Sequence, residues 1–323
     1  MGFLVGLSRL IAIRIFNIKI HRMDSRKIRE KEMSKNKKFW ILFTLILILS
    51  MSSQLISQAN RLLMLSPSAH TSSIGNVMLP MMSPARNHFD TDRFSFSRVN
   101  WLGNLVDDMN YLHFNLAKGS FDFHTLVFNY GEQLETDMTG LVTGKFSPSS
   151  SVWGISWGGV IKGYNVGATA KFLQHDLYTQ KTHGAAFDIA TYLPKVYKDL
   201  DVDIALRNFG FAPTFGDYKT KLPTSLNIAM TYPYKKWMFY EQHNIMKNHI
   251  TSGFGVAYKY EVKDEAIILG KMGYFLDDIH ELNYPTFGVD LKYDRYFIGI
   301  SYIYGDKTLP VSNTFRLTIN LEI

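Results

Sequence analysis

The sequence predicts an all-β protein, a closed antiparallel transmembrane β-barrel of about 14 strands with a short N-terminal plug segment. Three observations predict this fold. After residue 92, apolar and polar residues alternate with period two in runs of about nine to eleven residues, which is the length of a tilted membrane strand. The connections between these runs alternate between long and short. An apolar stretch typical of an export signal precedes them.

Composition and charge exclude several classes of protein. The chain has 323 residues, no cysteine and a mean hydropathy of -0.06, which is too polar for a helical membrane protein. The lack of cysteine excludes disulfides and thiolate metal sites. The net charge of +7 arises in the leader: residues 1–59 hold eleven Lys and Arg and three Asp and Glu, which leaves 24 basic and 25 acidic residues. We therefore expect no nucleic-acid partner.

The N-terminal region has the order of a signal peptide. Lys35, Lys37 and Lys38 precede an apolar run over residues 39–51, and a cleavage site with small residues follows at 57–59. Because that run is shorter than the roughly 20 residues of a membrane helix, we assign 33–59 to a signal peptide rather than to an uncleaved anchor. Residues 1–32 are interpreted as an extension upstream of the true start at Met33.

The mature chain divides into two parts. Residues 60–92 are rich in Met, Pro and Ser and lack strand periodicity, so we expect an N-terminal plug segment there, followed by an outer-membrane barrel over 93–323. The final strand shows the alternation most clearly, with Phe315 and Ile319 on one face and Arg316 and Thr318 on the other. The predicted strands are 93–101, 109–117, 120–130, 150–159, 164–174, 184–193, 201–209, 223–232, 236–245, 252–260, 266–275, 285–293, 295–304 and 314–322.

The lengths of the connections support a membrane barrel independently. Barrels of the outer membrane make tight turns at the periplasmic end and carry long loops at the surface, whereas a soluble sandwich has no reason to do so. Aromatic residues near the predicted strand ends suggest an interfacial girdle: Trp101, Tyr130, Tyr164, Tyr192, Tyr232, Tyr234, Trp237, Tyr293, Tyr296 and Tyr304. The predicted long connections are 102–108, 131–149, 175–183, 210–222, 246–251, 276–284 and 305–313.

Short segments in a characteristic order resemble the PorV/PorQ group of FadL-related outer-membrane barrels. They are residues 65–69 (LSPSA), 75–76, 83–85 (SPA), 94–97 with Trp101, 128–132 (FNYGE), 167–171 (GATAK), 187–189, 206–210 (LRNFG), 222–223 and the closing strand 315–323. The resemblance implies a fourteen-strand barrel whose N-terminal segment lies in or under the lumen. It also implies a part in type IX secretion, in which secreted cargo is handled at the outer membrane. The segment before Pro84 lacks the family's Gly-rich, Asp-containing stretch and the Asn directly before Pro-Ala.

Two histidine and serine patterns suggest hydrolysis, and we assign neither a catalytic role. Residues 154–158 (GISWG) match the nucleophile-elbow pattern, but they lie inside a predicted strand with no helix after it. A serine hydrolase on the barrel wall requires a serine and a histidine within hydrogen-bond reach, and no spacing in the sequence obliges them to meet. The histidines concerned are His113, His124, His175, His183, His243, His249 and His280, and none forms a metal-ligand motif.

Charged residues on the inward face are the candidate site, because isolated charges must pair across the lumen or line water. These lumen charges are Lys171, Asp188, Asp203, Arg207, Lys271, Asp290, Lys292 and Arg316. Met78, Met81 and Met82 in the plug segment would form either a flexible gate for an apolar ligand or simple packing.

The sequence therefore favours a non-enzymatic outer-membrane protein without a cofactor or metal. The first hypothesis, from the resemblance, is assistance to secretion or surface attachment of cargo, with secretion-system subunits or cargo as partners besides membrane lipid. The second is a FadL-like channel for a small hydrophobic ligand, and the third is a membrane serine hydrolase. A continuous apolar tunnel would favour transport, while a lumen filled by paired charges would favour a scaffold or secretion role. The long connections 131–149 and 210–222 are the expected docking surface.

Overall fold

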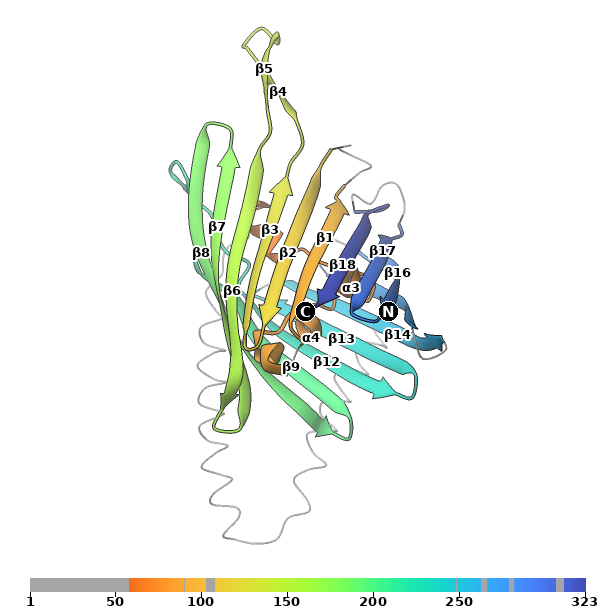
Figure 1. Cartoon of the computed structure of the whole chain (residues 1–323). Coiled ribbons are helices and arrows are strands. Elements are labelled where there is room, and N and C mark those ends of the chain that lie inside the picture. The colour runs from red at the N-terminus through yellow and green to blue at the C-terminus, as the bar shows by residue number, and fades with distance from the viewer. Residues whose placement is uncertain are drawn as a thin grey trace. The chain divides into compact units, whose positions relative to one another are not determined.

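The computed structural model describes residues 58–89, 91–102, 108–247, 249–262, 266–278, 282–305 and 311–323. The upstream extension expected over residues 1–32 lies outside these ranges, as does the signal peptide expected over 33–59 except for its last two residues, which begin η2. Fourteen antiparallel strands form a closed barrel, in the order β1-β18-β17-β16-β15-β14-β13-β12-β9-β8-β7-β6-β3-β2 (Figure 1). The predicted fold class is confirmed.

Consecutive strands pair along the whole wall, apart from two small hairpins that are inserted in its connections. The hairpins are β4 (Gln133–Thr136) with β5 (Val142–Phe146) and β10 (Thr214–Phe215) with β11 (Tyr218–Lys219). The barrel strands are β1 (Arg93–Asn100), β2 (Asn110–Lys118), β3 (Phe121–Asn129), β6 (Ser149–Ile161), β7 (Tyr164–Leu177), β8 (Gln180–Tyr197), β9 (Leu200–Phe211), β12 (Ser225–Tyr234), β13 (Trp237–Met246), β14 (His249–Val262), β15 (Ala266–Asp277), β16 (Tyr284–Tyr293), β17 (Tyr296–Ile303) and β18 (Phe315–Glu322).

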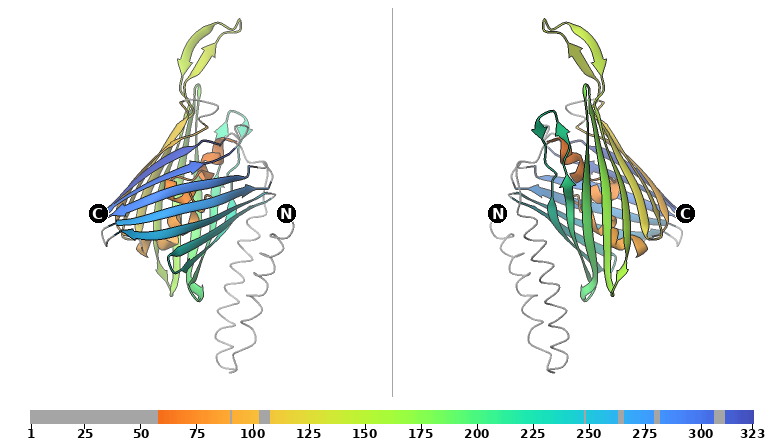
Figure 2. Two further views of the ribbon diagram at one scale, coloured as in Figure 1. Left: turned by 90° about the vertical axis from the view of Figure 1, so that its right-hand side faces the viewer. Right: turned by 90° about the vertical axis from the view of Figure 1, so that its left-hand side faces the viewer.

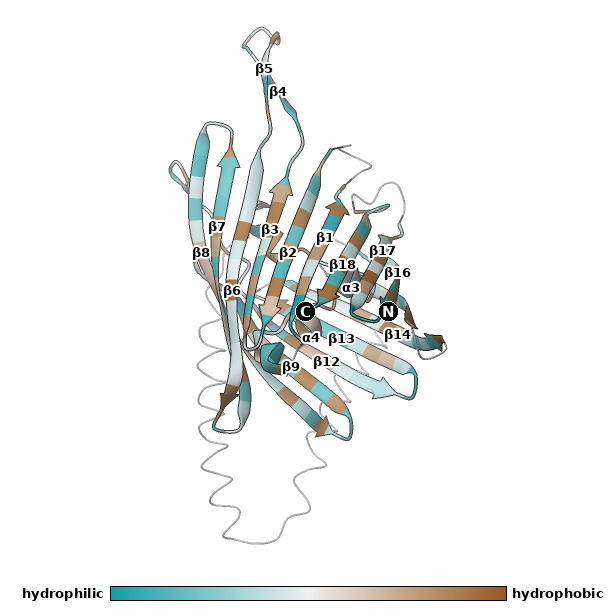
Figure 3. Ribbon diagram, in the orientation of Figure 1, coloured by the Kyte–Doolittle hydropathy of each residue, from teal (hydrophilic) through white to brown (hydrophobic). Residues whose placement is uncertain are grey.

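Alternation along each strand sets the two faces of the wall (Figure 3). In β18, Arg316 and Thr318 are buried in the lumen while Phe315 and Ile319 are exposed on the outside. An exposed apolar outer face on a closed barrel is stable only against lipid, because water would make such a surface aggregate. The protein is therefore an outer-membrane barrel. Among the described residues, no helix is both long enough and apolar enough to cross a membrane.

Two of the predicted long connections are mostly strand. β7 continues to Leu177 and β8 begins at Gln180, so most of the predicted loop 175–183 is strand. Likewise only residues 247 and 248 separate β13 from β14, where 246–251 was predicted. In β7 and β8 the strand ends carry polar residues on both faces, so they lack the alternation that marks a membrane strand.

Three of the predicted girdle aromatics face the lumen instead of the membrane interface. Trp101 and Tyr130 pack against the buried core, and Tyr192 stacks under the Arg86 guanidinium at 3.9 Å. Their position near strand ends suggested a girdle, but inward strand parity decides which way a side chain points. Trp237, Tyr293 and Tyr296 are exposed at the short-turn end, as a girdle requires.

The residues from 58 to 89, here called the lumenal segment, lie inside the barrel (Figure 2). They form four short helices, η2 (Gln58–Met64), α3 (Ala69–Ser72), α4 (Leu79–Met82) and η3 (Pro84–Phe89). Wall side chains satisfy their backbone N–H groups. Thr318 Oγ1 accepts from Ala69 at 2.8 Å, and Gln242 Oε1 accepts from both Met78 and Leu79 at 2.9 and 2.7 Å.

Glycines in the wall allow the lumenal segment to approach the strands closely. A Cβ on Gly273 would overlap the Gly75 backbone, and one on Gly167 would overlap the backbone at Pro84 and Ala85. Gly75 itself has a φ of 73°, which favours glycine there. The same overlap with residues 73–75 or 84 arises at Gly158, Gly253, Gly255 and Gly288. These six wall glycines form the glycine seat of the lumenal segment.

Candidate functional site

The first cluster of lumen charges joins three of the predicted residues. Lys171 Nζ lies 2.6 Å from Asp188 Oδ2, and Arg207 Nε lies 3.4 Å from the same oxygen. Asn208 completes the cluster, because its amide N–H donates to Asp188 Oδ1 and its side-chain oxygen accepts from Lys171, each at 2.8 Å. Two cations therefore share one buried carboxylate.

The second cluster joins the wall to the lumenal segment. Asp290 is fully buried and pairs with Lys271 of the neighbouring strand and with His70 Nδ1 of α3, the latter at 2.9 Å. Asn320 Nδ2 lies 3.1 Å from the other ring nitrogen of His70. Burial lowers the pKa of His70, an effect that Asp290 opposes. The Lys271–Asp290 ion pair therefore joins two wall strands, and the contacts of His70 with Asp290 and Asn320 fix α3 to the wall.

The other predicted charges find different partners. Arg86 of η3 makes a bidentate ion pair with Asp203, with Nε at 3.0 Å from Oδ1 and Nη2 at 2.6 Å from Oδ2. Lys292 pairs with Glu322 at 2.7 Å, and both are about one-third exposed at the short-turn end.

Arg316 bonds to hydroxyl groups in the lumen. This side chain is 1 % exposed, and its Nη1 donates to Ser72 Oγ at 2.6 Å while its Nε donates to Tyr111 OH at 3.3 Å. The guanidinium also lies 5.6 Å from the centre of the Trp101 ring. The charge thus links α3 to the wall near the aromatic residues of the loop end.

The three methionines differ in position. Met78 is buried at the start of α4, whereas Met82 at its end is exposed. Met81 is intermediate. They do not form one surface, and the apolar contacts of the lumenal segment are made elsewhere.

A packed apolar cluster, here called the apolar chamber, lies toward the loop end of the lumen on one side of the barrel. Its walls are the inward side chains of six consecutive strands, and Leu62 and Leu63 of η2 fill it. Leu65 and Leu222 lie at its edge, together with Trp101, Met109 and Tyr130. The sequence analysis did not identify this chamber, although the apolar residues of its walls all occupy inward-facing positions of their strands. The wall residues are Val99, Tyr111, Leu126, Phe128, Val152, Leu173 and Ala186.

The nucleophile-elbow pattern lies within β6, as expected for strand glycines. Ser156 faces the lumen and its hydroxyl lies 2.9 Å from Thr169 Oγ1. A second lumenal serine, Ser150, lies 2.7 Å from His175 Nδ1. The other ring nitrogen of His175 is buried without a hydrogen-bond partner, so no carboxylate orients this imidazole.

A different serine and histidine meet on the outer wall, where Glu241 joins them. His243 Nδ1 lies 2.9 Å from Ser252 Oγ, and His243 Nε2 lies 2.8 Å from Glu241 Oε1. The predicted loop at 246–251 concealed this contact. The connection has only two residues, so Met246 pairs with His249 and His243 pairs with Ser252 across β13 and β14. The alternation along β13 could have identified the trio, because it places Glu241 and His243 on the outward face with Phe239 and Ile245.

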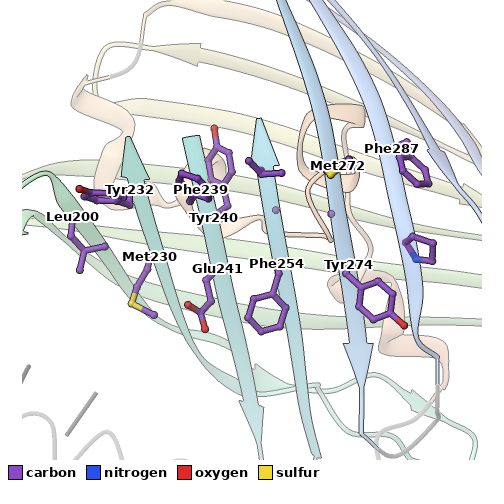
Figure 4. A pocket seen from close by; sticks show the side chains of 14 residues that line it. Leu200, Met230, Tyr232, Phe239, Tyr240, Glu241, Phe254, Met272, Tyr274 and Phe287 are labelled. Atoms are coloured by element: carbon purple, nitrogen blue, oxygen red, sulfur yellow. The ribbon is translucent and has the colours of Figure 1, made fainter. Parts of the chain in front are cut away.

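An apolar groove of ≈ 610 Å³ borders this trio on the outer wall. Figure 4 shows Glu241 between Met230 and Phe254 in a row of side chains that crosses the strands. The next row toward the short-turn end supplies the bulk of the walls, with Tyr232, Phe239, Val256, Met272 and Phe287.

One group of side chains has the donor types of a cation site. The ligand atoms of His249, Asp277 and Asp278 lie within 4.8 Å of one another at the loop end. His249 Nε2 is 2.7 Å from Asp277 Oδ1 and 3.7 Å from Asp278 Oδ1, which describes a histidine hydrogen-bonded to a carboxylate.

Comparison with known proteins gives likenesses of fold. No protein-family model matches the chain, and no curated protein matches it. The structure is similar to the Pseudomonas putida toluene transporter TodX, with a TM-score of 0.47 and 12% identity over 78% of this chain and 96% of that chain. It is similar to the CymD monoaromatic hydrocarbon channel, with a TM-score of 0.44 and 9% identity over 80% and 96%. For a Rhodopseudomonas blastica porin triple mutant the values are 0.34 and 6% over 72% and 99%. All three TM-scores lie below 0.5, so they do not decide between functions.

Proposed function

We propose that this barrel is a channel for small hydrophobic molecules, and that the lumenal segment closes it. The apolar chamber is the observation that carries the proposal. The interior of an outer-membrane barrel is ordinarily polar. Here six neighbouring strands line the lumen toward the loop end with aliphatic and aromatic side chains, which suits a hydrophobic ligand arriving from the surface.

The occupant of the chamber is a short 3-10 helix that the ligand would replace. Leu62 and Leu63 bury their side chains there, and Asn60 holds the same helix by donating to Lys221 O at 2.8 Å and Thr220 Oγ1 at 3.0 Å. A helix of this length has little intrinsic stability, so its position depends on those contacts. A hydrophobic molecule competes for the same apolar surface.

Passage beyond the chamber requires the rest of the lumenal segment to move. Its charged contacts with Asp203 and Asp290 and its close approaches at the glycine seat lie outside the chamber. A continuous apolar tunnel is therefore not present: the chamber is apolar, and the lumen outside it holds the paired charges. The proposal assigns ligand capture to the chamber and gating to the part of the lumenal segment that contacts those charges.

Substitutions in the chamber test the capture step. Leu126→Asn puts an amide into the apolar wall and is expected to lower uptake of N-phenyl-1-naphthylamine by cells at least about tenfold, which is ~1.4 kcal/mol of binding. Leu63→Ala weakens the packing of η2 in the chamber and is expected to raise uptake by a similar factor. Leu134→Asn, on the exposed hairpin, makes the same chemical change outside the lumen and serves as the matched control.

Two control measurements separate loss of ligand capture from misfolding and from general leakage. The heat-dependent shift of the barrel in gel electrophoresis reports that each variant is folded, and a water-soluble dye of similar size reports leakage. Unchanged uptake in folded Leu126→Asn protein, or equal gains for both dyes in Leu63→Ala protein, would contradict the proposal.

A second candidate function is assistance to secretion through a contact at the cell surface, and a separate feature of the structure supports it. The β4–β5 hairpin projects beyond the other connections at the loop end (Figures 1 and 2). Its apolar side chains are highly exposed, and Met138 is 106% exposed. Asp137 orders the tip by accepting from Thr139 Oγ1 at 2.6 Å, Thr139 N at 2.8 Å and Leu141 N at 3.0 Å, and these bonds lower its pKa. An ordered apolar tip outside the membrane suits contact with another protein.

Removing the apolar character of the tip tests this candidate. Serine at Leu134, Met138, Leu141 and Val142 is expected to abolish recovery of co-purifying envelope proteins from solubilised membranes, with dye uptake unchanged. Serine at the exposed Val160 and Ile161 of the short-turn end is the control. Equal recovery of partners by the hairpin variant and the unaltered protein would reject the candidate.

A further inference from the structure

Ionisable groups on the lipid-facing wall need an explanation beyond channel function. Glu241 and His243 point outward from β13 and are 28% and 29% exposed, with Phe239 below them and Ile245 above them on the same face. Charged groups within the apolar band are costly and mark functional sites in membrane proteins. Within the described residues their hydrogen-bond partners are each other and Ser252, and the His243 ring also lies edge-on to the Phe254 ring, with the ring centres 6.0 Å apart.

We propose that Ser252, His243 and Glu241 hydrolyse lipid esters at the outer wall of the barrel. The three side chains are linked as in a serine hydrolase, with one imidazole nitrogen at the serine hydroxyl and the other at a carboxylate. The two nitrogens are exchanged relative to the Ser-His-Asp triad, because Nδ1 faces Ser252 and Nε2 faces Glu241. Ser252 is the nucleophile, His243 is the general base, and Glu241 is a positioning residue that acts through His243. The lumenal pair Ser150 and His175 lacks that third group.

The apolar groove supplies a place for the acyl chain. Glu241 belongs both to the hydrogen-bonded trio and to the lining of the groove, so the two are contiguous. Ser252 is three residues from the loop end of β14, while Phe239, Met272 and Phe287 extend the groove toward the short-turn end. A lipid in the outer leaflet has the same polarity, with its ester near the surface and its chain directed to the membrane centre.

The reaction balances with an ester and water as the co-reactants. Ser252 Oγ attacks the carbonyl carbon while its proton passes to His243. The C–O bond to the leaving alcohol breaks, and His243 gives that proton to the alcohol oxygen. Water then attacks the acyl-serine with His243 as base, which releases a fatty acid and restores the serine hydroxyl.

Purified full-length barrel in vesicles of palmitoyl-oleoyl phosphatidylethanolamine tests the proposal. We expect release of fatty acid and labelling by a fluorophosphonate probe. Both are expected to fall roughly 1,000-fold or more in Ser252→Ala and His243→Asn. Glu241→Gln is expected to lower kcat about 100-fold with KM unchanged, as loss of base positioning requires.

Ser151→Ala is the matched control. Ser151 also faces outward, and it accepts a hydrogen bond from Trp153 Nε1 at 3.2 Å. Its loss is expected to leave labelling and fatty-acid release unchanged. Folded unaltered protein that neither labels nor releases fatty acid would overturn the proposal, as would Ser252→Ala protein that retains both. Dye uptake is independent of this result, so failure here leaves the channel proposal standing.

Discussion

Asp290→Ala is expected to destabilise the barrel by about 3–5 kcal/mol, because it leaves Lys271 buried without its counterion. The change also releases His70 and therefore α3 from the wall. Unfolding by urea in lipid vesicles, followed by tryptophan fluorescence, measures the free energy of unfolding.

Two further variants identify the cause. The double change Lys271→Met with Asp290→Leu removes both charges and is expected to recover most of the lost stability. Glu322→Ala removes the partner of Lys292, where both side chains reach water, and is expected to cost at most about 1 kcal/mol. A loss for Asp290→Ala no larger than that for Glu322→Ala would show that the buried pair does not hold the structure.

Gly273→Val is expected to displace the lumenal segment from the barrel. The new side chain would overlap the Gly75 backbone, which cannot retreat without breaking the bond from Gly75 N to Thr286 Oγ1 at 3.0 Å. Trypsin is then expected to cleave after Arg86, at a rate at least about tenfold above that of the unaltered protein, because cleavage follows the population of the open state.

Gly270→Val is the matched control for this change. Gly270 lies three residues earlier in β15, and a Cβ there meets nothing within 4 Å. The two variants have the same composition and the same strand, but only one enters the glycine seat. Equal trypsin sensitivity in both would mean that the glycines are not needed to seat the segment.

The period-two pattern was enough to predict the barrel and the direction of its charges. Lys171, Asp188 and Asp290 face inward because every second residue of a strand does so. The partners of these charges were beyond sequence reasoning. Asp290 pairs with His70, which is far away in the chain and has no strand register to place it.

Glycines and strand ends were the other features that the sequence alone could not predict. A strand glycine is compatible with a bulge, a bend or a close approach, and sequence alone does not distinguish Gly273 from Gly270. The polar residues near 175 and 249 were predicted as loop, since an aqueous strand extension has the composition of a loop. That error moved Ser252 out of register with His243 and concealed the outer-wall trio.

A reversible lock on the lumenal segment tests the channel account most directly. The hydroxyls of Ser72 in α3 and Ser301 in β17 lie 3.1 Å apart, so cysteines at both positions are placed to form a disulfide in a chain that has no other cysteine. We expect N-phenyl-1-naphthylamine uptake to be lost in the oxidised protein and restored by reductant, with each single-cysteine variant insensitive to both treatments. Equal uptake by the oxidised and reduced forms would contradict a gate formed by this segment.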